Sequence, residues 1–251
     1  MKKSKYSSFL GIKNLYKQKT KKDTVEKKNE IGSTPLVSRN GIDHLKECYE
    51  STKGAEQAWI NHCKMNKSII SYLFSGMMIR KTLCLNCNSF SNRFDQFLDL
   101  SLSIEKGFTC LDNCLEHYFN VECISDEYDC EKCKKKGVAL SKFFITNLPN
   151  IIIIHLKRFS YFPRPEKINQ KIIFPLNNLK FNKYMITQDK HSYTLNGFVM
   201  HQGTIEKGHY TSYSRRKDIW YQFDDENVYK IKQESVERMQ GYILFYERDN
   251  F

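Results

Sequence analysis

Two pairs of cysteines have the spacing of a metal site. Cys84 and Cys87 form one Cys-x-x-Cys pair, and Cys130 and Cys133 form a second pair beyond residues 88 to 129, 42 residues in all. Two thiolates spaced in this way can reach one tetrahedral Zn²⁺ from a tight turn of the backbone. Since four sulfurs leave no open coordination position, we predict a structural zinc site that stabilises the insertion and does not catalyse a reaction.

An alternative for these cysteines is that they are buried thiols without a metal. Polar neighbours favour an exposed position and therefore the zinc site; they are Asn86, Asn88, Lys132 and Lys134. Three further cysteines, Cys110, Cys114 and Cys123, are predicted to be packing residues.

A histidine and a carboxylate occur where a general base and its partner could lie. His209 follows the glycine-containing segment from Gly203 to Gly208 and begins a predicted strand, and Asp224 ends the next predicted strand. In a hairpin the two side chains would come within reach, and the carboxylate would fix the imidazole tautomer. The spacing alone is a weak signal, because a histidine in a strand is more often a packing or surface residue and an Asp-Asp pair is more often a turn.

The elements that must position these residues are mainly strands. β-branched and aromatic runs between turn residues predict strands over 141–146, 151–159, 193–201, 209–215, 219–223 and 242–247. A helix is predicted from Leu111 to Phe119, with Thr109 and Asp112 as its capping box and Cys114 in the core. Residues 42 to 74 have helical spacing, and we expect two or three helices there with an interruption around residues 51 to 54. The fold class is therefore α+β.

Several segments closely resemble the ubiquitin-specific proteases, which are papain-like cysteine deubiquitinases. Around the histidine they are Leu195–Gly203, Gly208–Tyr213, Trp220–Asp225 and Tyr242–Tyr246. Upstream they are Ala58–His62, Ser68–Ile70, Phe74–Gly76, the two cysteine pairs, Ile154–Phe159 and Ile173–Pro175. The resemblance covers roughly residues 58 to 247 in family order. It implies a papain-like fold with a helical thumb, a β-rich palm and zinc-tipped fingers that bind ubiquitin.

The same resemblance implies roles for particular residues. His209 would be the general base and Asp224 its orienting partner, in a reaction that hydrolyses the isopeptide bond at the ubiquitin C-terminus. Asp225 is a neighbouring acid that could help to position the site. His201, Gly208 and Tyr210 would line the loops that contact the ubiquitin tail.

The nucleophile of the family is not found in this sequence. The family places it in an Asn-x-Cys segment that begins a thumb helix, and no such segment precedes Ala58. Cys48 precedes an aromatic residue, but Glu47 and Glu50 would raise the pKa of its thiol. We therefore predict a deubiquitinase-family chain that is inactive as it stands. The alternative functions are an inactive ubiquitin-binding or scaffold module and a truncated fragment.

The expected organisation is a Lys-rich tail and one partial protease domain. Residues 1–40 are predicted to be a disordered tail, and residues 41–251 the domain, with most of the helical thumb missing. Within the domain we expect a thumb remnant at 41–76, zinc-tipped fingers at 77–140 and the palm at 141–251. A palm without most of its thumb would expose apolar surface, so a partner that covers this face is expected.

Charge and hydropathy narrow the partners further. The net charge is +12, but residues 1–30 contribute +7 of it, from ten lysines against three acids, and the rest of the chain carries +5. A zinc-ribbon module that binds nucleic acid is therefore the weakest hypothesis. No apolar run approaches the roughly 20 residues that a bilayer requires, which argues against a membrane protein. The absence of a recognisable signal peptide and the Cys-x-x-Cys pairs predict a reducing compartment, the cytoplasm or nucleus.

Overall fold

The computed structural model describes residues 50–161, 164–187 and 189–250. The predicted tail at residues 1–40 and the candidate thiol Cys48 lie outside these ranges. Among the described helices, none is both long and apolar enough to cross a membrane.

Two helices, α3 (Glu50–Met65) and α4 (Ile69–Phe74), precede the strands. The predicted interruption around residues 51 to 54 is wrong, because α3 runs through these residues without a break. Gly54 is tolerated within the helix where α3 packs on a strand, since a Cβ there would lie 3.1 Å from the Phe94 ring. The N-terminus of α4 is capped by Ser68, whose hydroxyl accepts a hydrogen bond from the Ser71 amide at 3.1 Å.

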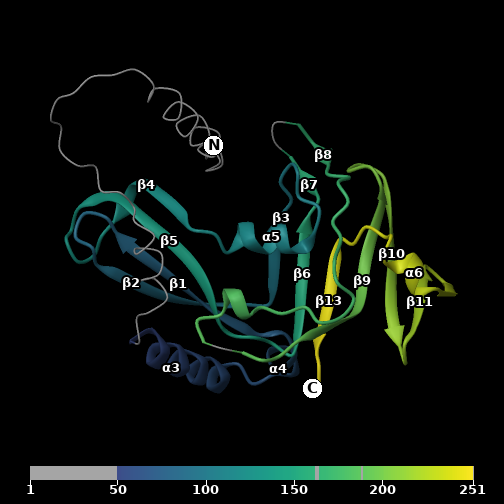
Figure 1. The fold of residues 1–251 in the computed structure, drawn as a ribbon, viewed down its shortest axis with the longest axis horizontal. Helices are drawn as coiled ribbons and strands as arrows, with labels where there is room; N and C mark the ends of the chain where they lie inside the picture. The colour runs from purple at the N-terminus through teal and green to yellow at the C-terminus, as the bar shows by residue number, and fades with distance from the viewer. Residues whose placement is uncertain (1–49, 162–163, 188, 251) are drawn as a thin grey trace. The chain divides into compact units, whose positions relative to one another are not determined.

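Four antiparallel strands form one sheet, which we call the finger sheet (Figure 1). Its strands are β1 (Gly76–Cys84), β2 (Phe90–Phe97), β4 (Glu122–Asp129) and β5 (Lys136–Asn147), in the order β2-β1-β5-β4. Its buried core is small and consists of Ile79, Leu83, Leu140 and Phe144. The cysteine pairs lie where the strands turn, after β1 and between β4 and β5.

Seven strands form a second sheet, which we call the palm sheet. Its order is β12-β11-β10-β9-β13-β6-β3. The bounds are β3 Asp99–Ser103, β6 Ile151–Lys157, β9 Tyr193–Gly203, β10 Gly208–Arg216, β11 Ile219–Asp224, β12 Asn227–Ile231 and β13 Ile243–Arg248. Only β3 and β6 pair in parallel among these neighbours. The main hydrophobic core includes residues of this sheet and of helix α5 (Leu111–Tyr118).

Short elements complete the palm region. Strands β7 (Phe159–Ser160) and β8 (Glu166–Lys167) form a small hairpin that follows β6. The 3-10 helix η1 spans Asn182–Tyr184, and α6 spans Gln233–Val236 between β12 and β13.

Helix α5 forms where the sequence predicts it, but its cap differs. Cys110 occupies the N-cap position, and the Asn113 side chain accepts hydrogen bonds from the amides of Thr109 (3.1 Å) and Cys110 (3.3 Å). The predicted box of Thr109 with Asp112 is therefore wrong, because Asn113 satisfies these amides instead. Cys114 is fully buried in the core, as predicted.

Two other expectations differ from the structure in position. Cys123 was predicted to pack in the interior, but it is exposed, because β4 is an edge strand of the finger sheet. The interval 77–140, expected to form the fingers, also contains β3 and α5, which belong to the palm side of the fold. In the other direction, β5 of the finger sheet continues beyond residue 140 to Asn147.

Candidate metal centre and catalytic pair

The two cysteine pairs lie on turns of the same local conformation. Asn88 and Lys134, which each follow the second cysteine of a pair, have positive φ angles of 54° and 57°. Their amides donate to the carbonyl oxygens of Cys84 (2.9 Å) and Cys130 (2.8 Å), respectively. Each turn therefore closes on its own first cysteine, and both sulfurs of a pair point to the same side of the turn.

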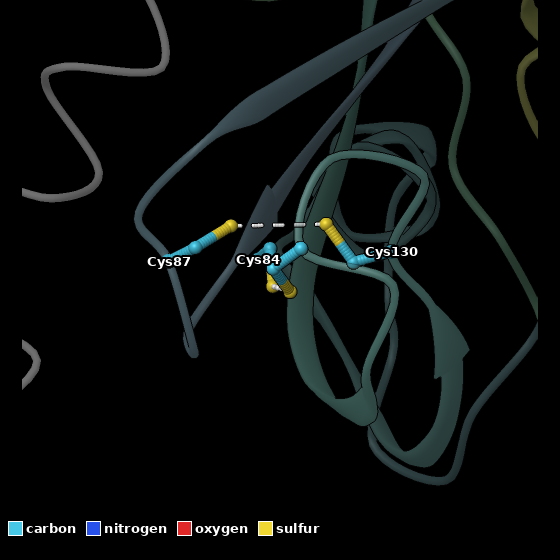
Figure 2. Close-up of side chains that lie close together, drawn as sticks. Cys84, Cys87 and Cys130 are labelled. Atoms are coloured by element: carbon cyan, nitrogen blue, oxygen red, sulfur yellow. Dashed lines mark hydrogen bonds between the residues drawn. The ribbon is translucent and has the colours of Figure 1, made fainter.

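The four sulfur atoms have the spacing of a tetrahedral metal site (Figure 2). The Cys87 and Cys130 sulfurs lie 3.8 Å apart, the Cys84 and Cys133 sulfurs lie 4.0 Å apart, and all four lie within 4.8 Å of one another. A tetrahedron with Zn–S bonds of about 2.3 Å has edges of about 3.8 Å. The residues therefore fit Zn²⁺, which would hold the ends of both turns together and leave no position for a substrate.

Local hydrogen bonds favour the thiolate form in two of the four cysteines. Backbone hydrogen bonds, foremost that of Cys133, lower the pKa of Cys130 to about 6. The pKa of Cys87 is also lowered, first by the hydroxyl of Ser89, whose oxygen lies 3.0 Å from the Cys87 sulfur. The same hydroxyl lies 3.7 Å from the Cys130 sulfur. Ser89 thus contributes to the metal site by lowering the pKa of a cysteine ligand. This role was not predicted from the sequence, although a hydroxyl residue two positions after Cys87 could have indicated it. In Cys133 a backbone hydrogen bond with Lys135 acts in the same direction, but burial and hydrogen bonds with the other cysteine sulfurs outweigh it and raise the pKa to about 11.

His209 and Asp224 are brought together by neighbouring strands. His209 is the second residue of β10 and Asp224 is the last residue of β11, and these strands pair in an antiparallel hairpin. The His209 Nε2 atom lies 2.5 Å from the Asp224 Oδ1 atom. This hydrogen bond is the main reason that the pKa of His209 is raised above its usual value; the charges of Asp224 and Asp225 add to the effect, while burial opposes it.

Asp225 is held close to the pair by a tight turn. Asp224 pairs with Asn227, so Asp225 and Glu226 alone connect β11 to β12. Asp225 adopts a positive φ of 50°, a conformation that aspartate tolerates better than most residues. Ligand-type atoms of His209, Asp224 and Asp225 all lie within 4.8 Å of one another. Asp225 therefore adds negative charge beside the imidazole.

The three residues expected to line the ubiquitin tail differ in accessibility. Tyr210 is 54% exposed, and it pairs across the strands with His201, which is only 9% exposed. The His201 ring lies against the backbone of Gly208, where a Cβ would be 1.9 Å from the His201 Nε2 atom. Gly208 and Tyr210 are therefore exposed at the surface, while His201 packs beneath the turn.

Comparison with known proteins identifies the family. The family model for ubiquitin carboxyl-terminal hydrolases matches residues 37–246. This chain belongs to that family. The chain is 33% identical to ubiquitin carboxyl-terminal hydrolase 3 from Homo sapiens over 234 residues, which is 84% of this chain and 44% of that protein. It is 34% identical to ubiquitin carboxyl-terminal hydrolase 12 from Salmo salar, over 70% of this chain and 52% of that protein. The chain thus spans about half the length of these relatives.

Solved structures of the same family share the fold. One is the deubiquitinating module of SAGA, which contains a Ubp8 variant with Sgf11, Sus1 and Sgf73 and is bound to monoubiquitin. It matches this chain with a TM-score of 0.68 and 32% identity, over 74% of this chain and 43% of that chain. The SAGA Ubp8 module bound to ubiquitin aldehyde matches with a TM-score of 0.68 and 29% identity, over 78% of this chain and 47% of that chain. The predicted α+β fold of the family is thereby confirmed.

Family membership and geometry together confirm the predicted zinc site. The four cysteines cluster as in the zinc-binding finger of ubiquitin-specific protease domains. The catalytic roles of His209 and Asp224, and the tail-binding roles of His201, Gly208 and Tyr210, stay predictions that rest on the resemblance.

Proposed function

We propose that this chain takes part in thiol-dependent hydrolysis of the isopeptide bond at the C-terminus of ubiquitin. The observation that carries the proposal is the hydrogen bond between His209 Nε2 and Asp224 Oδ1, in a chain of the ubiquitin carboxyl-terminal hydrolase family. This is the arrangement that orients an imidazole for general-base catalysis.

In this proposal the two ring nitrogens of His209 have different tasks. Because Nε2 is engaged by Asp224, the free Nδ1 atom is the one that would take the proton from a thiol. The thiolate would then attack the carbonyl carbon, and the protonated His209 would give its proton to the leaving amine. The raised pKa of His209 favours the protonated ring, so Asp224 stabilises the ion pair of thiolate and imidazolium.

Ubiquitin is the substrate class that the relatives support. The solved structures that match this chain include Ubp8 modules bound to monoubiquitin and to ubiquitin aldehyde. The finger and palm sheets of this chain supply the parts of the fold that the family resemblance assigns to ubiquitin binding. We therefore propose ubiquitin, or a protein that carries it, as the partner.

A second candidate function is ubiquitin binding without hydrolysis. In the part of the chain that the structure describes, the residues grouped with His209 are Asp224 and Asp225, and no cysteine belongs to that group. Without a thiolate, the base has no group to activate. As it stands, the chain would bind ubiquitin and release it unchanged.

A further partner is proposed for the helices before the sheets. Large apolar side chains are exposed on α4 and just before it; they are Met65, Ile69, Ile70 and Tyr72. Ile69 is 65% exposed, and none of the α4 residues is buried. Such a surface favours a protein partner, in the place that the family resemblance gives to the thumb. We propose a reducing compartment, the cytoplasm or nucleus, for a chain whose Cys-x-x-Cys pairs bind metal.

A complementation experiment tests the first function. A segment with the family's Asn-x-Cys sequence is fused to or mixed with the chain, and cleavage of a ubiquitin C-terminal amide is followed. We expect cleavage that is lost in His209→Ala and in the Cys→Ser version of the segment. His191→Ala is the matched control, because His191 also lies 2.5 Å from an aspartate, Asp189, near the opposite end of β9. A folded, ubiquitin-binding mixture that does not cleave would count against the hydrolytic function.

A further inference from the structure

Strand β9 extends beyond its neighbour β13 at the end where His209 lies. The first residue of β13, Ile243, pairs with Val199, and the Val199 carbonyl accepts a hydrogen bond from the Tyr242 amide at 2.8 Å. Alternate carbonyls of a strand point to the same side, so those of His201 and Gly203 point past the end of β13. They would lack a strand partner there, and an unpaired carbonyl in a partly buried position is costly.

Lys167, the last residue of β8, occupies this place. Its Nζ atom donates hydrogen bonds to the carbonyl oxygens of His201 (2.8 Å) and Gly203 (3.0 Å). The side chain is half-buried, so the two bonds are only partly exposed to water. An ammonium group therefore takes the place of the missing strand partner, and hydrogen bonds from a charged donor are stronger than neutral ones.

The main chain that carries Lys167 is itself anchored. The Ile168 amide donates to the Arg158 carbonyl at 2.7 Å, and the Arg158 Nη1 atom donates back to the Ile168 carbonyl at 3.2 Å. Arg158 is only 2% exposed, and its Nε atom also donates to the Gly241 carbonyl at 2.7 Å. Lys167 is thus held from a fixed point in the palm.

The two bonds of Lys167 flank the residue that faces the candidate base. Gln202 lies between His201 and Gly203, and it pairs directly with His209 across the β9–β10 ladder. Gly203 pairs with Gly208, and the turn between them closes through the Thr204 amide, which donates to the Lys207 carbonyl at 2.7 Å. Figure 1 places β8 and the β9–β10 connection at the same end of the palm sheet.

We propose that Lys167 is a positioning residue, which fixes the end of β9 and the turn 203–208 so that His209 meets Asp224 and the ubiquitin tail. The catalytic importance of the His209 position rests on the proposed function. The claim that Lys167 fixes the end of β9 and the turn 203–208 does not depend on that function. Lys167 has no direct contact with reacting atoms. It acts through the strand that pairs with His209.

The first test measures the turn itself, without ubiquitin. Lys167→Met keeps the aliphatic stem and removes the ammonium, and Lys167→Arg keeps a charged donor. Lys171→Met is the matched control, because Lys171 is exposed four residues further along. We expect amide hydrogen exchange in residues 202–209 to be roughly tenfold faster in Lys167→Met, with smaller changes in Lys167→Arg and none in Lys171→Met. The pKa of His209, followed by NMR, should fall in Lys167→Met, because its bond to Asp224 loosens.

The second test measures binding of intact ubiquitin and of ubiquitin without its C-terminal tail. Lys167→Met should weaken the binding of intact ubiquitin several-fold and leave the binding of the truncated form unchanged. Unchanged exchange and an unchanged His209 titration in Lys167→Met would overturn the inference, as would equal weakening of both ubiquitin forms. If the unmodified chain binds neither form, the proposed function fails, and the exchange and titration results still decide the role of Lys167. Thermal melting of each variant checks that the palm remains folded.

Discussion

Removal of zinc is expected to disorder the tip of the finger sheet. The two turns span residues 84–89 and 130–135, twelve residues in all, and fixing them costs about 12–24 kcal/mol of backbone entropy. The finger core has four buried side chains, whose burial stabilises the finger sheet by about 6–12 kcal/mol. That stabilisation must also offset the entropy cost of ordering the strands. Zinc binding by such sites contributes about 10–16 kcal/mol. The order of the tip therefore depends on the metal.

The assay combines zinc content, hydrogen exchange and thermal unfolding. We expect chelation to remove protection from residues 84–89 and 130–135 and to lower the melting temperature, while the amides of α5 stay protected. Cys130→Ser should reproduce this without a chelator. Cys123→Ser is the matched control, because Cys123 is exposed on the same edge of the sheet and outside the site. Equal protection of the tip with and without zinc would refute the reasoning.

Two further perturbations concern the turn and the catalytic pair. Gly208→Ala should weaken binding of the ubiquitin tail, because the new Cβ would collide with His201. Gly107→Ala is the control, because Gly107 has a φ of 94° and open space around it, so the substitution should cost only local backbone strain. Ubiquitin-binding assays on both variants check this. Asp224→Asn should lower the pKa of His209, measured by NMR. Since Asp224 raises this pKa in the folded chain, its stabilising effect is present below the unfolded value of about 6.5 and is lost as pH rises through the folded value.

The strands of the palm could be predicted because their residues carry the signal locally. Runs such as Ile151–Lys157 combine β-branched residues with turn residues at each end, and the structure has strands there. Strand β12 was missed, because it is a short edge strand in which even the apolar residues Val228 and Tyr229 are exposed. The burial of Cys123 was mispredicted for a related reason, since the sequence does not say which strand lies at an edge.

The candidate site could be predicted only where its residues fall within short motifs. The two cysteine turns and the His209 segment have fixed spacing, so the sequence alone identifies their residues. The sequence does not reveal Lys167, because its partners are carbonyls of β9 that lie beyond the first residue of β13 and so have no strand partner on that side. No local pattern reports the relative lengths of two strands that pair from distant parts of the chain.

The most direct test of the proposed function is reaction of the purified chain with ubiquitin that carries a C-terminal electrophile. Intact mass reports an adduct, and a parallel measurement reports binding of unmodified ubiquitin. We expect ubiquitin to bind without forming an adduct, because the described residues place no cysteine beside His209 and Asp224. An adduct that is lost in Cys48→Ala would contradict this and make Cys48 the nucleophile. Absence of any ubiquitin binding by the folded chain would contradict the proposed function itself.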